Sequence, residues 1–504
     1  MAHRFVDLRG DGKKTYLYAQ DRTKRVQEVL WGDYLHVMRE FSDGWLEIDW
    51  ARRSSTKRRT LYIRKEHTVD RRPLEIIFVD VGQGDGAVLI SPERGADECI
   101  TVIDSGVGGN MRAFLNARFA TYRGFDFDAA ILTHPDTDHY AGFLDIFANH
   151  NIGFRTVYHN GLIERPVSGT WEKIGGTPRK DPATGVSYIY DLAVTRDAVS
   201  AAFSQVAPNS KYQFPRVMKA ALENPRIDDI RMLSTTHAQL EDGKAWMHGF
   251  APSNNRGYTI EVLGPVLETD SQGKCGLRRI GSYGETKNGH SILLKLRYGD
   301  FSVLFGGDLN EPAERFLLTH YTGRSRFPPK DAPSYDQMIQ DARPVFRSEV
   351  MKSCHHGSEK VTDAFLAAVN PAAFVISSGD AEGHVHPRPD LLGRLGVFGR
   401  GGAPVILSTE LQRSTRAMED RRSVDKLVAD IDKLAADPSQ ARLDKVKEDV
   451  RRLGRSNVEV YGAIYLKTDG ERLITAFRIE HKSETKKWFC FRYAFNQDGE
   501  LVRT

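Results

Sequence analysis

Two histidines and two aspartates crowd into the segment "HPDTDH", as His134, Asp136, Asp138 and His139. The apolar run that ends at Leu132 predicts a strand that delivers these residues in a loop. In an extended loop, positions 134 and 136 can face one ion while 138 and 139 turn towards a second. Two ions about 3.5–4 Å apart are a standard device for hydrolysis and for displacement at phosphorus. Helix capping would explain one aspartate but not two flanking histidines, so we predict a metal site.

The segments around this loop predict a layered α/β domain. Residues 73–90 and 98–106 contain long β-branched runs, and residues 112–119 have a helical pattern. Later strands are predicted in "YTIEVLGPV", "HSILLKLRYG", "FSVLFGGDL", "AAFVISSG" and "APVILS". The alternation of strands and helices favours an α/β fold. Residues of about 165–250 have poor periodicity, and we interpret them as an insertion that flanks the site.

Both ends of the chain predict smaller units. Residues 1–66 alternate apolar and polar positions between turn signals, which is typical of short strands. This pattern resembles a bacterial Src-homology-three-like barrel, so we predict a small β-barrel-like domain over residues 1–72. At the other end, residues 416–453 predict a pair of amphipathic helices with a turn at Asp437-Pro438, and strands follow. We expect residues 409–504 to complete or cover the preceding domain.

A basic stretch lies at the end of the first unit. Its interpretation is open between a solvated loop and hairpin face and a patch that binds a polyanion. The cationic residues are Arg52, Arg53, Lys57, Arg58, Arg59, Arg64, Lys65, Arg71 and Arg72.

Several motifs together resemble one family. "HPDTDH" is similar to the H-x-[HD]-x-D-H motif of the metallo-β-lactamase fold, and Asp136 stands where zinc hydrolases usually carry a second histidine. "FVDVGQGDGAVLI", "DSG", "SILLKLRYGDFSVLFGGDL", "SCHHGS" and "YGAIYLKTDG" follow the order found in ComEC-type hydrolases. The resemblance covers residues 73–408 and 458–480. It implies a metallo-β-lactamase αββα sandwich over residues 73–408, between the N-terminal barrel and a C-terminal helical and β extension.

The resemblance also implies roles for single residues. Asp308 in "FGGD" corresponds to the carboxylate that bridges both metals. His386 corresponds to a late ligand of the second metal, and His384 is an alternative to it. In "HHGS", either His355 or His356 is a ligand or the proton donor, and we favour His356 as the acid.

Two further points concern the surroundings of the metals. Asp104 and Asp80 are expected to orient histidines or to hold the loop. The third ligand of the first metal is open between Asn288, in an N-x-x-S pattern with Ser291, and His290. The "GQGDG" segment lacks the spacing and the lysine of a phosphate-binding loop, and we interpret it as a tight turn behind the metal loop.

The ligand set predicts two divalent ions, either Zn²⁺ or Mn²⁺, because carboxylates favour harder ions and histidines favour zinc. We expect a metal-dependent phosphodiesterase or nuclease that acts on DNA, with Asp138, His355 and His356 as catalytic residues. One alternative is a hydrolase of small molecules, such as a nucleotide, a lactone or a β-lactam. A second alternative is a binding subunit that docks a protein partner through the N-terminal barrel or the C-terminal extension.

The composition of the chain indicates the cellular compartment but says little about the substrate. The 504 residues carry 71 Lys and Arg against 67 Asp and Glu, a balance that says little about partners. Cys99, Cys275, Cys354 and Cys490 are widely spaced, which argues against a disulfide framework and against a thiolate zinc site. No signal-peptide core and no long apolar run is evident in the sequence, so we expect a cytoplasmic protein with no membrane partner.

Overall fold

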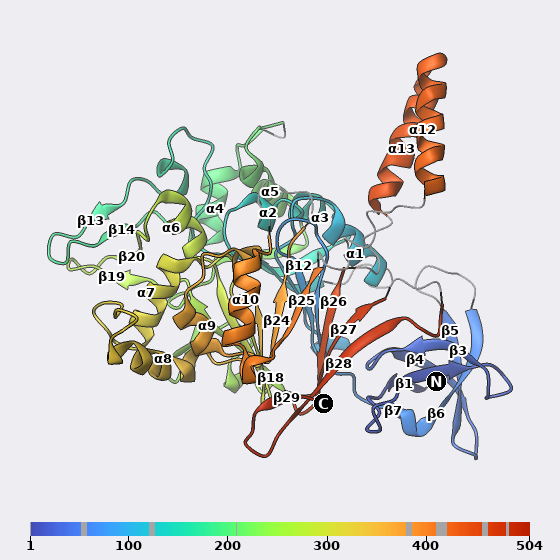
Figure 1. Ribbon diagram of the computed structural model, residues 1–504. Helices are drawn as coiled ribbons and strands as arrows, with labels where there is room; N and C mark the ends of the chain where they lie inside the picture. The colour runs from blue at the N-terminus through green and yellow to red at the C-terminus, as the bar shows by residue number, and fades with distance from the viewer. Residues whose placement is uncertain are drawn as a thin grey trace.

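Two large β-sheets packed face to face dominate the computed structural model (Figure 1). The structure describes residues 2–51, 58–119, 126–207, 209–379, 386–409, 421–455, 462–479 and 483–504. Helices cover the outer face of each sheet, which gives the layer order helix, sheet, sheet, helix. This arrangement confirms the predicted αββα sandwich.

The first large sheet joins the early strands of the sandwich to the end of the chain. Its strand order is β15-β12-β11-β10-β9-β8-β26-β27-β28-β29. The strands are β8 (Leu74–Phe78), β9 (Ala87–Ile90), β10 (Ile100–Ile103), β11 (Asp126–Leu132), β12 (Gly153–His159), β15 (Ile227–Met232), β26 (Ile464–Thr468), β27 (Leu473–Arg478), β28 (Trp488–Phe495) and β29 (Leu501–Arg503). Because β26 pairs with β8, the C-terminal strands complete this sheet.

The second large sheet has the order β16-β17-β18-β21-β22-β23-β24-β25. Its strands are β16 (Gln239–Glu241), β17 (Lys244–Trp246), β18 (Tyr258–Gly264), β21 (Leu293–Tyr298), β22 (Phe301–Phe305), β23 (Val350–Lys352), β24 (Ala373–Ile376) and β25 (Val405–Ser408). The last four run parallel, so their carboxyl ends meet at one edge of the sheet.

The continuous apolar runs of the sequence are explained by strands that are buried on both faces. In β8, Ile76 and Phe78 point into the cluster between the two sheets, while Ile77 points into the cluster under the helices. Successive side chains of a strand alternate in this way. The ring of Phe78 lies 6.1 Å from the ring of Phe305 in the opposite sheet, measured between centroids. This shared core fixes the two sheets, and therefore the loops at their edges, relative to each other.

The outer helices pack through apolar faces. Helices α1 (Asn110–Arg118), α3 (Phe143–Phe147), α4 (Arg196–Phe203) and α5 (Gln213–Glu223) share a core with the first sheet. Helices α7 (Glu311–Tyr321), α8 (Pro333–Phe346), α9 (Asp363–Val369) and α10 (Pro389–Phe398) share a core with the second. The other α-helices among the described residues are α2 (Thr137–Tyr140), α6 (Tyr283–Gly289), α12 (Arg421–Ala436) and α13 (Gln440–Arg455). Figure 1 shows α12 and α13 as a hairpin that projects from the sandwich.

The N-terminal residues form an antiparallel sheet in the order β3-β2-β6-β5-β4-β1-β7. The strands are β1 (Ala2–Val6), β2 (Thr15–Tyr18), β3 (Arg25–Val29), β4 (Tyr34–Glu40), β5 (Trp45–Ala51), β6 (Arg58–Arg64) and β7 (Thr68–Val69). This sheet has its own apolar core, which includes Leu17, Ile48 and Ile63. It contacts the C-terminal strands, for example where Lys467 Nζ donates to the Trp31 carbonyl at 2.7 Å.

The predicted insertion at about 165–250 contributes strands to both large sheets of the sandwich. Strand β15 extends the first large sheet, and β16 and β17 extend the second. A small sheet in the order β13-β14-β20-β19 combines β13 (Arg179–Lys180) and β14 (Ser187–Ile189) with β19 (Glu268–Thr269) and β20 (Cys275–Arg278). The low periodicity of the segment reflects these short elements.

Candidate metal centre

Loops from both large sheets converge at one edge of the sandwich. The first sheet supplies Asp104 directly after β10 and the "HPDTDH" loop two residues after β11. The second supplies Asp308 after β22 and the two histidines of "HHGS" after β23. Because β10 and β11 are parallel, as are β22 and β23, their carboxyl ends lie at the same edge. The sandwich thus brings together residues that lie far apart in sequence.

His139 is held in one orientation by Asp104. The Nδ1 of His139 lies 2.8 Å from Asp104 Oδ2, and Asp104 also accepts hydrogen bonds from the backbone and the hydroxyl of Thr133. A carboxylate only accepts, so Nδ1 carries the proton and Nε2 offers its lone pair. That Nε2 lies 3.2 Å from Asp308 Oδ1. The geometry fits the predicted orienting role of Asp104.

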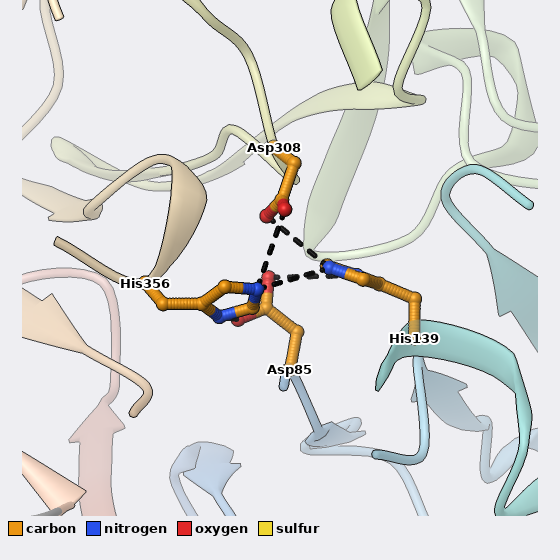
Figure 2. A group of neighbouring side chains, drawn as sticks. All are labelled: Asp85, His139, Asp308 and His356. Atoms are coloured by element: carbon orange, nitrogen blue, oxygen red, sulfur yellow. Dashed lines mark hydrogen bonds and ion pairs between the residues drawn. The ribbon is translucent and has the colours of Figure 1, made fainter. Parts of the chain in front are cut away.

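His356 is oriented in the same way from the opposite sheet. Its Nδ1 lies 3.2 Å from Asp85 Oδ1 and 3.1 Å from the Ser377 carbonyl, both of which are acceptors. Its Nε2 therefore offers a lone pair and lies 3.3 Å from each of His139 Nε2, Asp138 Oδ2 and Asp308 Oδ2. Two lone pairs that face each other beside carboxylates fit a divalent cation. Figure 2 shows Asp85, His139, Asp308 and His356, whose ligand atoms all lie within 4.8 Å of one another.

The electrostatics of this cluster favour positive charge. Burial lowers the pKa of His139, but Asp308 and Asp104 outweigh it and raise the pKa well above its usual range. Burial is likewise outweighed at His356, where Asp308 and Asp85 raise the pKa well above its usual range. Burial would raise the pKa of Asp308, yet His139 and His356 hold it well below its usual range. The field that favours a proton on these rings also favours a metal ion in their place.

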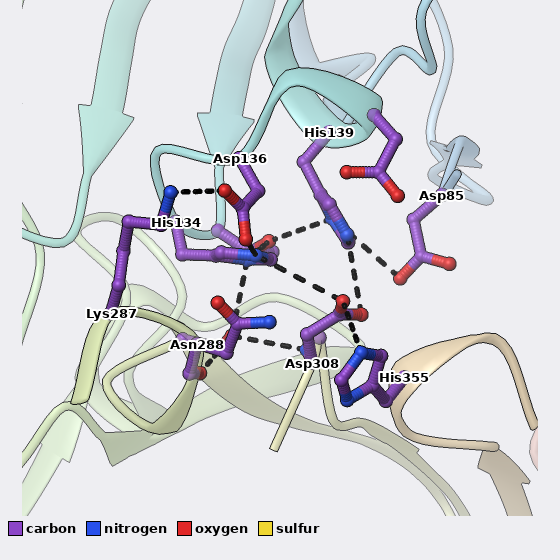
Figure 3. Close-up of polar contacts among 12 residues, drawn as sticks. Asp85, His134, Asp136, His139, Lys287, Asn288, Asp308 and His355 are labelled. Carbon is purple, nitrogen blue, oxygen red and sulfur yellow. Dashed lines mark hydrogen bonds and ion pairs between the residues drawn. The ribbon is translucent and has the colours of Figure 1, made fainter. Parts of the chain in front are cut away.

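His134 lies on the other side of Asp308. Its Nε2 is 3.5 Å from Asp136 Oδ2 and 4.0 Å from Asp308 Oδ2, and within the described residues it has no hydrogen-bond partner. Its Nδ1 faces the hydroxyls of Thr133 and Ser291 at 3.2 and 3.3 Å. The predicted ligands therefore divide into a His134–Asp136 side and an Asp138–His139 side. Asp308 lies between His134 and His139 (Figure 3).

Two residues of α6 engage Asp136. The ammonium of Lys287 forms an ion pair with Asp136 Oδ1, and it lies 3.1 Å from Glu164 Oε1. With its amide turned to satisfy both groups, Asn288 donates to Asp136 Oδ2 at 2.8 Å and to the Gly284 carbonyl at 3.1 Å. Burial opposes the ionised form, but His134 and then Lys287 hold the pKa of Asp136 below its usual range. Asp136 is therefore ionised and already paired.

The two alternatives for the third ligand lie in different places. Asn288 contacts Asp136, as described above. His290 is buried, and its Nε2 lies 2.7 Å from the Arg278 carbonyl. That ring nitrogen must donate, because a carbonyl only accepts. Of the two, the structure brings Asn288 into the site beside Asp136.

His355 lies at the exposed edge of the cluster. His355 Nε2 is 3.9 Å from Asp308 Oδ2, and 28% of its side chain is exposed, compared with 2% for His356. The rings of His355 and His386 lie 6.2 Å apart between centroids, and His386 is buried. His384 lies outside the described residues. His356, which the sequence analysis favoured as the acid, thus lies inside the cluster, whereas His355 is the more exposed of the two histidines.

Sequence reasoning did not single out Asp85, which lies in the segment interpreted as a tight turn. Gly84 has a φ of +113°, and a Cβ at this position would lie 1.9 Å from the Asp138 carbonyl oxygen. The glycine therefore allows the turn to press against the metal loop and places Asp85 beside His356. The sequence contains the glycine next to the aspartate, but only the position of the facing metal loop shows that this turn brings Asp85 to His356.

A buried lysine on β23 was also missed. Lys352 forms an ion pair with Asp85 Oδ2 and donates to the Gly307 carbonyl at 3.0 Å. Burial opposes the charged form of Asp85, but Lys352 and then His356 lower its pKa. Lys352 therefore connects the Asp85 turn to the loop that carries Asp308.

Backbone strain is concentrated in the same loops. Asp104, His355 and His356 have φ values of +54°, +49° and +52°, in the left-handed region that side chains with a Cβ rarely adopt. Such conformations persist where the surrounding contacts determine them, and they are frequent at functional sites.

Asp80 lies at the base of this region, where its Oδ1 accepts from the Gly82 backbone at 3.2 Å. Its carboxylate thus holds the glycine-rich turn, whereas it was predicted to orient histidines or to hold the metal loop.

Comparison with known proteins identifies the class. Residues 87–198 match the family model of the metallo-beta-lactamase superfamily. The chain therefore contains a domain of this superfamily, and the fold and the cation cluster define a metal-dependent hydrolase of the metallo-β-lactamase fold. No curated protein sequence matches the chain.

Two solved structures resemble the chain distantly. A metal-dependent hydrolase of the beta-lactamase superfamily has 10% identity and a TM-score of 0.29, covering 66% of this chain and 95% of its own. A mutant of the beta-hydroxylase CmlA has 8% identity and a TM-score of 0.29, covering 80% of this chain and 78% of its own. Among the described residues, no helix combines the length and the apolar character needed to cross a bilayer.

Proposed function

We propose that this protein is a metal-dependent phosphodiesterase that cleaves nucleic acid, with DNA as its substrate. The observation that carries the proposal is the buried cluster of Asp85, His139, Asp308 and His356, whose ligand atoms lie within 4.8 Å of one another, with Asp138 Oδ2 3.3 Å from His356 Nε2. The donor set suits Mn²⁺ or Zn²⁺. The ComEC-type order of motifs supports a phosphodiester as the bond that is broken.

The side chains have separable tasks. A divalent cation in this cluster acts as a Lewis acid towards phosphoryl oxygens and makes water more acidic. Asp104 and Asp85 fix the tautomers of His139 and His356, so that both Nε2 atoms face the same point. His355 lies 3.9 Å from Asp308 Oδ2 at the exposed rim, where it can pass a proton to the departing oxygen.

The basic stretch bears on how a polyanion would approach. Arg58, Lys65 and Arg72 are ion-paired with Asp49, Glu40 and Glu98, respectively. Arg59 and Arg71 are exposed. Arg52, Arg53 and Lys57 lie outside the described residues. A contribution of this stretch to binding of nucleic acid predicts affinity that falls as salt concentration rises.

The test is cleavage of labelled single- and double-stranded DNA and RNA in the presence of Mn²⁺. We expect the unmodified protein to cleave DNA and Asp138→Ala to lose cleavage, because Asp138 belongs to the cation cluster. The matched control is Asp331→Ala, a change at an exposed aspartate, which keeps full activity. Equal cleavage by the unmodified protein and Asp138→Ala, or cleavage of none of the four polymers, rejects the proposal.

A further inference from the structure

The carboxylates on the two sides of the site differ in whether a lysine ammonium of the protein neutralises their charge. On the Asp138–His139 side, the Nε2 atoms of His139 and His356 and the carboxylates lie 3.2–3.3 Å apart, and the nearby ammonium of Lys352 pairs with Asp85 rather than with Asp138 or Asp308. On the His134–Asp136 side, a lysine ammonium of the protein already lies against the carboxylate (Figure 3).

Lys287 is fixed in this position by its surroundings. Only 11% of its side chain is exposed, and its Nζ lies between Asp136 Oδ1 and Glu164 Oε1. Lys287 is carried by helix α6, whose N-terminus is closed by a capping box. The side chain of Ser282 accepts from the backbone of Glu285, and the side chain of Glu285 accepts from the backbone of Ser282. A buried ammonium with two carboxylate partners is costly to displace, because either carboxylate would be left without its counter-charge.

Asp136 has little capacity left for a metal. One of its oxygens pairs with the ammonium of Lys287, and the other accepts from the amide of Asn288 at 2.8 Å. The nitrogen left for a cation on this side is His134 Nε2, which lies 3.5 Å from Asp136 and 4.0 Å from Asp308. One imidazole beside a carboxylate that is already neutralised makes a weak site, and a divalent ion there would also face the ammonium.

We propose that the ammonium of Lys287 takes the place of a first metal ion, so that the protein binds one divalent cation at Asp138, His139, Asp308 and His356. The sequence predicted two ions, and the paired state of Asp136 disagrees with that count. The proposal rests on the metal-dependent class of the proposed function but not on nucleic acid as the substrate. It makes Lys287 a positioning residue, which holds Asp136 and the edge of the site in the absence of a first ion.

The test measures metal stoichiometry without any substrate. Chelator-treated protein is titrated with Mn²⁺ and, separately, with Zn²⁺ by calorimetry, and the bound metal is counted by elemental analysis after dialysis. We expect one equivalent for the unmodified protein and two for Lys287→Met, with the second equivalent bound at least tenfold more tightly than by the unmodified protein. Lys287→Arg keeps the cation and retains one equivalent.

The matched control is Lys360→Met, a change at an exposed lysine, which retains one equivalent. Two equivalents of similar affinity in the unmodified protein overturn the proposal, as does one equivalent in folded Lys287→Met. If Lys287→Met does not fold, Lys287→Gln is the substitute, since it also removes the ammonium and is expected to allow measurable binding of a second equivalent. Failure of folded Lys287→Gln to bind it then overturns the proposal. One equivalent without cleavage of nucleic acid would reject only the proposed substrate.

Discussion

Replacement of Lys352 by methionine tests the role assigned to the ion pair behind the metal centre. The side chains of Asp85 and Lys352 are 8% and 5% exposed, and each is the other's closest counter-charge. Methionine keeps much of the volume of the lysine stem but removes the ammonium. It leaves the Asp85 carboxylate buried near Asp308 and Asp138, which are also negative, with His356 Nδ1 at 3.2 Å as its nearest remaining cationic neighbour.

The magnitude follows from the burial of the pair. Two unit charges about 3 Å apart attract each other by about 5 kcal/mol at an effective dielectric constant of about 20. Removal of one partner of a buried pair costs about 3–5 kcal/mol, because the other charge remains without compensation. We therefore expect Lys352→Met to lower the free energy of unfolding by about 3–5 kcal/mol at neutral pH. In the double variant Asp85→Asn/Lys352→Met, no unpaired charge remains, and we expect most of the loss to be recovered.

The loss must also depend on pH. In the unmodified protein Lys352 lowers the pKa of Asp85 below its ordinary 3.8, so the pair contributes stability above that pH and loses it as pH falls. Without Lys352, burial of Asp85 is opposed only by the histidines, so its folded pKa is higher than in the unmodified protein and the carboxylate contributes less stability as pH rises. The difference between the two proteins therefore grows as pH rises from about 4 towards neutrality.

The assay is thermal and denaturant-induced unfolding of metal-free protein across this pH range, because a bound cation would itself compensate Asp85. Lys360→Met serves as the surface control and should change the free energy by less than about 0.5 kcal/mol. A loss in Lys352→Met that is small, or that stays constant with pH, would refute the reasoning. So would a double variant as unstable as Lys352→Met alone.

Other substitutions test separate contacts. Asp104→Asn leaves a single acceptor oxygen for both His139 Nδ1 and the Thr133 backbone. We therefore expect the affinity for metal to fall by about 10–100-fold. The measurement is chelator competition, with an unchanged circular dichroism spectrum as the control for folding. Burial raises the pKa of Glu314 on α7 from 4.5 to about 8, so the folded state favours the protonated acid. Stability is then full below pH 4.5 and falls as pH rises towards 8, at about 1.4 kcal/mol per pH unit at most, and Glu314→Gln should abolish this fall in an unfolding series. A metal affinity unchanged by Asp104→Asn, or the same pH slope in Glu314→Gln, would show that the assigned contact has no such effect.

Local sequence was enough to predict the candidate metal loop and the layered α/β domain, and the family resemblance implied the sandwich. The "HPDTDH" cluster follows a strand that the structure confirms as β11, Asp126–Leu132. The continuous β-branched runs predicted strands that are buried on both faces, and β8 shows this arrangement. These features are short in sequence, so residue type and spacing determine them. Asp104 could also be predicted, because it follows a strand of the same sheet that positions the metal loop.

The partners of the metal loop were decided only by tertiary structure. His356 lies 217 residues after His139, yet their Nε2 atoms are 3.3 Å apart. Lys352 and Asp85 are 267 residues apart and form one ion pair. Spacing along the chain cannot predict such contacts, because they depend on how the two sheets pack and on which loops meet at their common edge. The same holds for Lys287, whose ammonium meets Asp136 across that edge. The sequence could therefore predict candidate metal ligands, whereas the number of ions that we propose depends on charges that only the folded chain brings together.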